Sequence, residues 1–146
     1  MFNMSQNLQD IMSKDVITVQ ADQTIQEAAE MMKSNDIGSI PVVRNGELVG
    51  IITDRDITIR ATASGEDSHA SVEECMSTNL TVASPSTDPH EAANMMAQHQ
   101  IRRLPVVENG KIIGMVAIGD LATVNIYENE AGEALSDISE HHHDLS

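Results

Sequence analysis

The chain has 146 residues and a mass of 15.8 kDa, which suffices for one ordinary domain or two very small ones. Its 23 acidic and 8 basic residues give a net charge of −15. Such a charge disfavours binding to nucleic acid and to acidic membrane surfaces, because both interactions need a basic face on the protein. Aromatic residues make up 1%, which also argues against stacking on single-stranded nucleic acid.

Targeting and redox features are few. No apolar stretch approaches the about 20 residues that a membrane helix needs. Residues 1–10 lack the basic and apolar regions of a secretory signal. Cys75 is the only cysteine in the sequence, so an internal disulfide is excluded. These features predict a cytoplasmic protein.

The first predicted elements form a β-α-β-β-α unit that follows a short helical lead-in at residues 7–12. Thr24 and Glu27 have the spacing of a capping box, and the apolar residues after them recur at helical spacing. Asn45-Gly46 supplies the positive φ angles of a tight hairpin turn. The expected strands cover residues 16–19, 40–43 and 48–53, and the expected helices follow Thr24 and cover residues 54–63.

The second half repeats this order, because residues 12–57 can be laid over residues 76–121 with one local slip. The matches include Met12-Ser13 with Met76-Ser77, Glu27-Ala28-Ala29 with Glu91-Ala92-Ala93, Pro41-Val42-Val43 with Pro105-Val106-Val107, Asn45-Gly46 with Asn109-Gly110, and Asp56 with Asp120. Two copies are too few for a solenoid, and each copy is too short to form a stable domain by itself. We therefore expect an α/β (α+β) fold in which two β-α-β-β-α units pack by pseudo-two-fold symmetry.

The predicted elements of the second copy have the following bounds: a lead-in at 71–76, strands at 80–83, 104–107 and 111–116, a helix starting at the Asp88 cap with Pro89, and a last helix at 119–127. The predicted domain limits are 7–63 for the first unit, 64–71 for a linker, 72–127 for the second unit and 128–146 for an acidic tail. We assign no role to this tail or to its histidines, His141–His143.

The motif from Gly50 to Asp56 runs from a strand end into a helix start. Free backbone N–H groups at such a helix start attract anions. Thr53 can donate its hydroxyl to a phosphate oxygen, Asp56 can accept from two ribose hydroxyls, and Arg55 offers a forked donor for phosphate. The alternative is that Thr53 and Asp56 only cap the helix. The residues by themselves leave both readings open.

In the first copy, the series Met-Ser, Thr-Val, Glu-Ala-Ala, Met-Met and Ile-Pro-Val-Val-x-Asn-Gly-x-Leu-Val-Gly-Ile-Ile-Thr-Asp-Arg-Asp resembles a cystathionine-β-synthase (CBS) domain. The two copies together resemble a tandem CBS pair, also called a Bateman module, over about residues 8–127. The resemblance implies a small stand-alone bacterial protein with no catalytic or transporter domain attached. It also implies an energy-sensing regulatory module.

The resemblance implies that Thr53 and Asp56 grip phosphate and ribose. In the second copy Asp120 matches Asp56, but Ala117 replaces the threonine, which puts phosphate binding there in doubt. We therefore expect nucleotide to fill the Asp56 site first. Arg102 and Arg103 enter a strand at a place where CBS pairs commonly carry phosphate-binding residues, although an ordinary surface ion pair is the alternative.

The adenine would need an apolar slot with exposed backbone polar groups. The residues proposed to line the two slots are Thr18, Val19, Ile40 and Pro41 for one, and Val82 and Pro105 for the other. Core packing is the alternative role for most of these side chains.

The predicted function is non-catalytic binding of AMP, ADP or ATP in clefts between the halves, without a cofactor or metal. Gly-x-Ser-x-Gly, His-Glu-x-x-His and Gly-x-x-x-x-Gly-Lys are absent from the sequence. The alternatives are a ligand-free dimerisation or interaction scaffold and a sensor for a ligand of the S-adenosylmethionine type. The expected partners are an unidentified regulated protein and a second copy, which would pack on small helix faces formed by Ala28, Ala29, Ala92 and Ala93.

Overall fold

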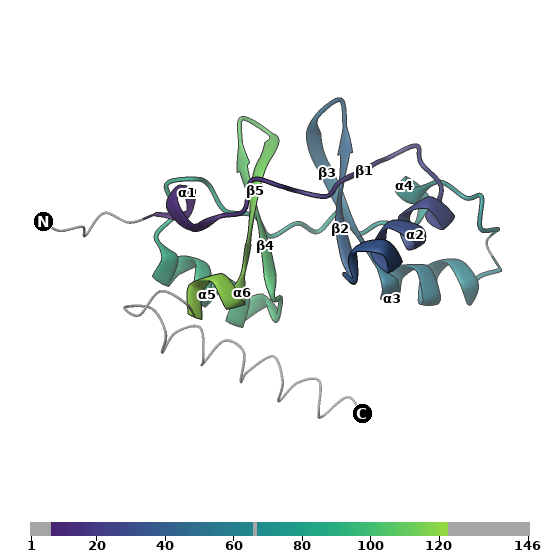
Figure 1. Cartoon of the computed structure of the whole chain (residues 1–146). Helices are drawn as coiled ribbons and strands as arrows, with labels where there is room; N and C mark the ends of the chain where they lie inside the picture. Colours follow the sequence, from purple (N-terminus) through teal and green to yellow (C-terminus); the bar gives the residue numbers. More distant parts are fainter. Residues whose placement is uncertain (1–6, 66, 123–146) are drawn as a thin grey trace, which may run out of the picture. The chain divides into compact units, whose positions relative to one another are not determined.

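The computed structural model describes residues 7–65 and 67–122, so the acidic tail, His141–His143 and the end of the last predicted helix lie outside the described residues. In chain order the elements are α1 (Leu8–Ile11), β1 (Val19–Gln20), α2 (Ile25–Asn35), β2 (Ser39–Arg44), β3 (Glu47–Thr53), α3 (Asp54–Asp56), the π-helix η1 (Ile57–Thr62), α4 (Val72–Cys75), α5 (Pro89–His99), β4 (Arg103–Glu108), β5 (Lys111–Ala117) and α6 (Ile118–Ala122) (Figure 1). The predicted mixed α and β fold class is confirmed. Within the described ranges, no helix is long and apolar enough to cross a membrane.

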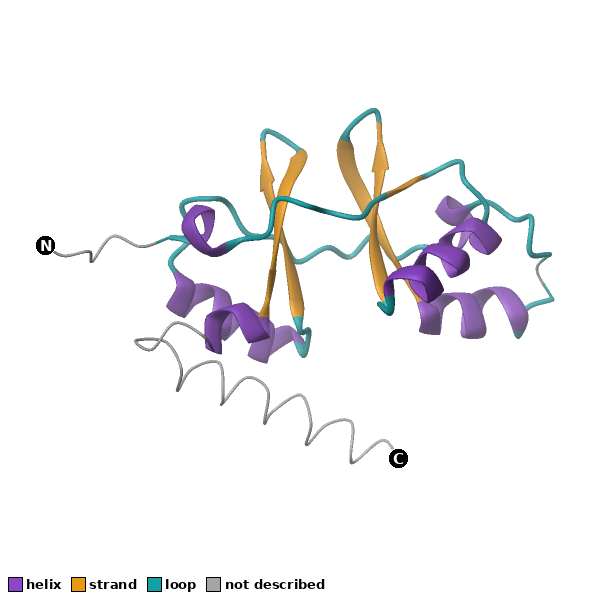
Figure 2. Ribbon diagram, in the orientation of Figure 1, coloured by secondary structure: helices purple, strands orange, loops and turns teal. Residues whose placement is uncertain are grey.

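The chain divides into two compact units that do not follow the boundaries of the sequence repeat. The first unit consists of residues 17–80, and the second combines residues 7–16 with residues 81–122. The lead-in of each repeat is therefore exchanged: α1 belongs to the unit of the second repeat, and α4 belongs to the unit of the first. In both units a β-hairpin carries helices to one side (Figure 2).

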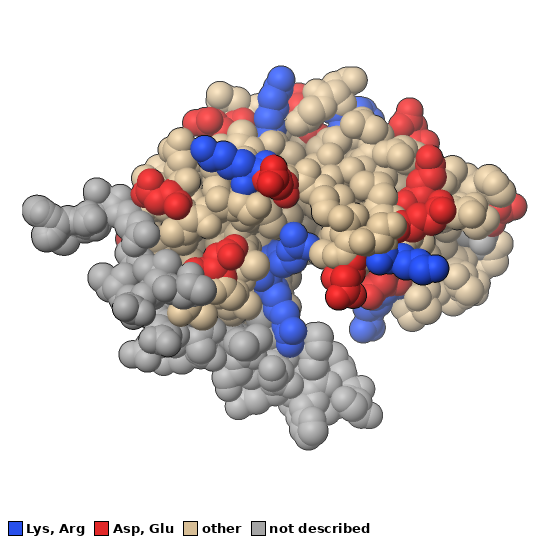
Figure 3. Space-filling model, in the orientation of Figure 1, with Lys and Arg blue, Asp and Glu red and all other residues tan. Residues whose placement is uncertain are grey.

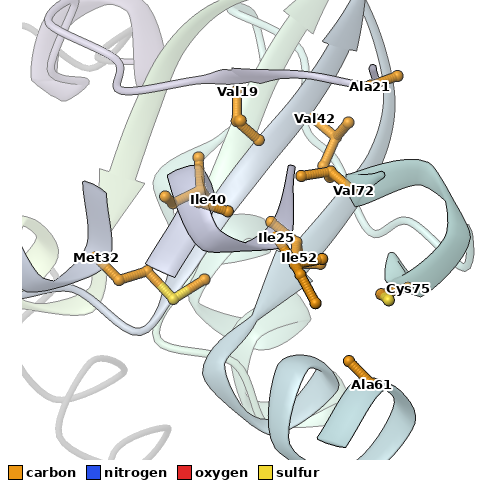
Figure 4. Packing of buried hydrophobic residues seen from close by; sticks show 11 residues of the cluster. Val19, Ala21, Ile25, Met32, Ile40, Val42, Ile52, Ala61, Val72 and Cys75 are labelled. Atoms are coloured by element: carbon orange, nitrogen blue, oxygen red, sulfur yellow. The ribbon is translucent and has the colours of Figure 1, made fainter. Parts of the chain in front are cut away.

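In the first unit, β2 and β3 form the predicted antiparallel hairpin, and β1 pairs with β2 in parallel. Asn45 and Gly46 adopt φ angles of 54° and 83°, as the tight turn requires. The apolar core gathers side chains from α2, the hairpin, η1 and the exchanged helix α4, including Ile25, Ile52 and Val72 (Figure 4).

The second unit repeats this hairpin with β4 and β5, but its first strand is reduced to a single bridge between Ala83 and Val106. The cause is visible in the sequence. In the first unit the N–H of Ala21 extends the ladder by donating to the carbonyl of Val43 at 2.9 Å. The matching residue of the second repeat is Pro85, which has no N–H to donate.

Helix α2 begins at the predicted capping box. Thr24 Oγ1 accepts from the N–H of Glu27 at 3.1 Å, and the Glu27 carboxylate accepts from the N–H of Thr24 at 2.9 Å. This backbone hydrogen bond, followed by that from the Thr24 hydroxyl, holds the pKa of Glu27 below its ordinary value. The sequence thus correctly located the start of this helix.

The alanine faces that the sequence analysis assigned to a dimer have another role. Ala28, Ala92 and Ala93 are buried in the cores of their own units, and only Ala29 is exposed. Small side chains at these positions let each helix approach its own hairpin closely. Self-association stays a prediction, but these three alanines do not supply its surface.

Each exchanged lead-in approaches the backbone of the hairpin that it joins. In the first unit, Ser77 and Ile51 exchange two backbone hydrogen bonds of 2.8 and 2.9 Å. A Cβ placed on the adjacent Gly50 would lie 2.5 Å from Met76 Sδ and 2.9 Å from the carbonyl oxygen of Ser77. In the second unit, Ser13 and Met115 form the equivalent bridge beside Gly114.

We predict that Gly50→Ala lowers the free energy of unfolding by about 1–3 kcal/mol, because the added methyl group overpacks against the backbone of the lead-in. Chemical denaturation measures this change. The matched control is Gly119→Ala in α6, where a Cβ meets nothing within 4 Å. Its stability should be unchanged or raised by up to about 1 kcal/mol. Equal losses in both variants would contradict the close approach.

Candidate functional site

The turn from β3 into α3 is built by Thr53 and Asp56. Thr53 Oγ1 accepts from the N–H of Asp56 at 2.9 Å, and Asp56 Oδ2 accepts from the N–H of Thr53 at 3.0 Å. This reciprocal pair is a capping box, so the two residues do cap the helix as the simpler alternative predicted. Both are part-buried, at the end of the strand that carries Ile51 and Ile52.

Thr53 and Asp56 keep hydrogen-bonding groups that the cap does not use. A hydroxyl has one proton and two lone pairs, and the cap uses Thr53 Oγ1 only as an acceptor. An ionised carboxylate has about four lone-pair sites, of which the cap uses one on Asp56 Oδ2. The same two side chains can therefore cap the helix and also offer one donor and several acceptors to a ligand.

The backbone amides at this helix start are already committed. The N–H of Asp54 donates to the carbonyl of Gly38 at 2.9 Å, and the N–H of Arg55 donates to the Asp54 carboxylate at 2.7 Å. The third amide, on Asp56, serves the cap. The amides that the sequence analysis offered to an anion are therefore occupied, and any phosphate here would be bound by side chains.

Arg55 lines a depression whose lining residues do not include Thr53 or Asp56. Together with Asp54, Thr58 and Ile59 it lines an open depression of about 420 Å³ on the helical side of the first unit. Ile59 is 53% exposed. Among the described residues, no hydrogen bond or ion pair joins the Arg55 side chain to Thr53 or Asp56.

Arg60 is the cation that lies near Asp56. Its Nε is 3.7 Å from Asp56 Oδ1, and its Nη1 donates to the carbonyl oxygen of Met76 at 3.2 Å. The Asp56 side chain is 13% exposed, whereas that of Arg60 is 55% exposed. The sequence alone left Arg60 open between a charge on the helix surface and a residue of the cleft, and its spacing of four residues from Asp56 was the available signal.

In the second unit, Asp120 keeps half of the cap. Its Oδ2 accepts from the N–H of Ala117 at 2.8 Å, but Ala117 has no hydroxyl to return the bond. Arg103 is the direct cross-strand partner of Ala117 and is part-buried, so its Cβ lies on the same face of the hairpin. Arg102 is exposed, and its carbonyl accepts from the N–H of Ile118.

The two sites therefore differ in charge as well as in hydroxyl groups. Ser39 occupies the position across from Thr53 that Arg103 occupies across from Ala117. The chain has 23 acidic and 8 basic residues, and Figure 3 shows side chains of both kinds on the face in view. On such an acidic chain, one arginine across from Ala117 is a substantial local change for an anionic ligand.

The residues proposed for the adenine slots fall into two groups. Val19 and Ile40 are 1% and 0% exposed in the core of the first unit, so their side chains have the core role. Pro41 and Pro105 are buried, whereas Thr18 and Val82 are half-buried outside named strands. Thr18 and Val82 are thus the members whose side chains retain partial exposure.

Comparison with known proteins agrees with this architecture of two like units, each ending its hairpin in an Asp-capped turn. The family profile described as CBS domain matches residues 8–61 and 72–126. The chain belongs to the CBS domain family and carries a tandem pair, which is the arrangement of a regulatory module. The CBS domain-containing protein YhcV of Bacillus subtilis is 48% identical over 133 residues, covering 91% of this chain and 95% of YhcV.

Two solved structures are similar. Hypoxic Response Protein I, determined with two coordinated zinc ions, has a TM-score of 0.75 at 32% identity, covering 82% of this chain and 98% of that one. The CBS domain pair of protein MJ0100, in complex with 5′-methylthioadenosine and S-adenosyl-L-methionine, has a TM-score of 0.71 at 30% identity, covering 84% and 98%. In the described part of this chain, no group of three or more His, Cys, Asp or Glu residues could hold a metal ion.

We predict that Thr53→Ala lowers the free energy of unfolding by about 0.5–2 kcal/mol, because the N–H of Asp56 loses its acceptor. Thr53→Ser should retain most of the stability, since serine keeps the hydroxyl. Thr24→Ala is the matched control, because it removes the same cap from α2. Thermal and chemical denaturation measure all three variants. An unchanged Thr53→Ala would show that the cap does not contribute.

Proposed function

We propose that the chain is a non-catalytic cytoplasmic sensor that binds an adenine nucleotide, AMP, ADP or ATP, through the turns at Asp56 and Asp120. The observation that carries this proposal is the Thr53 and Asp56 pair. It is held rigid by its capping bonds and still has a hydroxyl proton and carboxylate lone pairs to offer. Vicinal ribose hydroxyls are donors that suit such a carboxylate.

The neighbouring MJ0100 pair supports the adenosine part of this proposal, because both of its ligands contain adenosine. It also supports a second candidate, an adenosyl ligand without phosphate. A sulfonium cation such as S-adenosylmethionine suits a chain of net charge −15 better than a triphosphate does. A thermal-shift screen with adenosine, AMP, ADP, ATP, S-adenosylmethionine and 5′-methylthioadenosine separates the two, and no shift with any of them favours the ligand-free scaffold.

The proposed partners are the nucleotide, a second copy of the chain and an unidentified regulated protein. The exposed Ile59 beside its open depression supports self-association, because a large apolar side chain in water gains free energy when it is covered. Ligand binding would act on regulation by favouring one arrangement of this assembly over another.

We predict that the Asp56 site fills before the Asp120 site. Asp56→Asn should remove the tighter binding event in calorimetry with AMP, because each lost charged hydrogen bond costs about 1.5–3 kcal/mol, tenfold or more in affinity. Asp120→Asn should spare that event. Asp54→Asn is the control, since Asp54 is exposed on the same helix outside the capping pair. Loss of the tighter event in Asp120→Asn alone would reverse the order of the sites.

We predict that replacing Arg102 and Arg103 by Ala weakens AMP about tenfold or more and leaves adenosine nearly unchanged, because only AMP carries the phosphate that a guanidinium recognises. The single variants should assign most of the effect to Arg103, whose Cβ shares a hairpin face with Ala117 beside Asp120. Calorimetry with both ligands measures the difference. An equal loss for adenosine would mean that the arginines support the fold.

A further inference from the structure

Arg60 contacts two parts of the first unit, the turn at Asp56 and the lead-in at Met76. Its Nε faces the Asp56 carboxylate at 3.7 Å, and its Nη1 donates to the Met76 carbonyl at 3.2 Å. The first contact is with the candidate ligand site. The second is with the backbone of the exchanged lead-in that contains α4.

The Met76 peptide lies where this lead-in meets β3. The next residue, Ser77, exchanges two backbone hydrogen bonds with Ile51, and the Met76 side chain packs against Gly50. A few residues later, after Leu80, the chain leaves the first unit and enters the second at Thr81. A change at the Met76 carbonyl therefore acts on the segment that connects the two units.

The two contacts of Arg60 differ in strength. An N–O distance of 3.7 Å is too long for a hydrogen bond, so the contact with Asp56 is an ion pair that a hydrogen-bonding ligand can displace. Arg60 also lies in the π-helix η1, a geometry that is rare and occurs frequently at functional sites.

We propose that Arg60 couples occupancy of Asp56 to the backbone of the lead-in at Met76, an inference that rests on the proposed function. When ligand hydroxyls donate to the Asp56 carboxylate, they replace Arg60 as its partner, and the ion pair between Asp56 and Arg60 is lost. The guanidinium then reorients toward solvent, and its hydrogen bond to Met76 is weakened. The Ser77 and Ile51 bridge loosens as a result.

The sequence does not repeat the position of Arg60 in the second copy. The residue four positions after Asp120 is Val124, whose side chain carries no charge and no hydrogen-bonding group. The proposal therefore concerns the Asp56 site.

The coupling can first be tested in the ligand-free protein, with amide hydrogen exchange of Ser77 and Ile51 followed by NMR. Arg60→Met keeps the length of the side chain and removes its charge and donors. It should speed exchange at both amides about two- to fivefold, the change that corresponds to one exposed polar interaction. Arg55→Met, in the preceding helix α3, is the matched control and should leave both rates unchanged.

A double-mutant cycle then tests the link to Asp56. Asp56→Asn should also speed exchange at the two amides. In the double variant, Asp56→Asn should add nothing to Arg60→Met, because both changes break one chain of contacts. Additive effects, or no effect of Arg60→Met, would overturn the proposal without any ligand being present.

The last arm uses AMP at a concentration at which calorimetry shows the site to be full in each variant. In the unmodified chain AMP should speed exchange at Ser77 and Ile51, and in Arg60→Met it should not change the rates. An equal AMP effect in both proteins, or AMP binding without an exchange response, would refute the coupling and leave the proposed function standing. Absence of AMP binding would refute AMP as the ligand of this site, and the ligand-free cycle would still decide whether Arg60 links Asp56 to Met76.

Discussion

The close approach of each exchanged lead-in to the hairpin of the other repeat is the constraint on which this structure depends. At Ile51 and Ser77, and again at Ser13 and Met115, backbone N–H and C=O groups that are partly shielded from water find partners in a different segment of the chain. The glycines beside these bridges make room for a methionine side chain and a backbone carbonyl. Both cores depend on this arrangement, because α1 contributes Leu8 to one core and α4 contributes Val72 and Cys75 to the other.

The capping turn shows how one pair of residues can have a structural and a chemical role at once. Thr24 with Glu27 and Thr53 with Asp56 make the same reciprocal bonds. They differ in their surroundings, because the Asp56 carboxylate is largely buried and faces a cation, whereas Glu27 is exposed. A carboxylate shielded from water interacts more strongly with hydrogen-bond donors, which is why the proposed site is at the end of β3 and not at the start of α2.

The two repeats diverge at single residues with identifiable physical effects. Pro85 removes the N–H that would extend the first strand of the second repeat, and Ala117 removes the hydroxyl that would complete its cap. Arg103 adds a charge across from Ala117 at the position that Ser39 occupies in the first repeat. The two copies of the repeat therefore end their hairpins in turns that differ chemically.

The sequence by itself determined the repeat, the family, the hairpin turns and the caps at Thr24 and Asp88, because these depend on residues within a few positions of one another. It also identified Thr53 and Asp56 as a pair, while the hydrogen-bond directions at each oxygen were needed to show that they cap α3. Only the tertiary structure decided that the lead-ins are exchanged, that Val19, Ile40 and three of the four alanines belong to the cores, and that Arg60, rather than Arg55, faces Asp56. These features depend on which segments meet in space, and the pattern of apolar residues along the chain is the same whichever hairpin a lead-in joins.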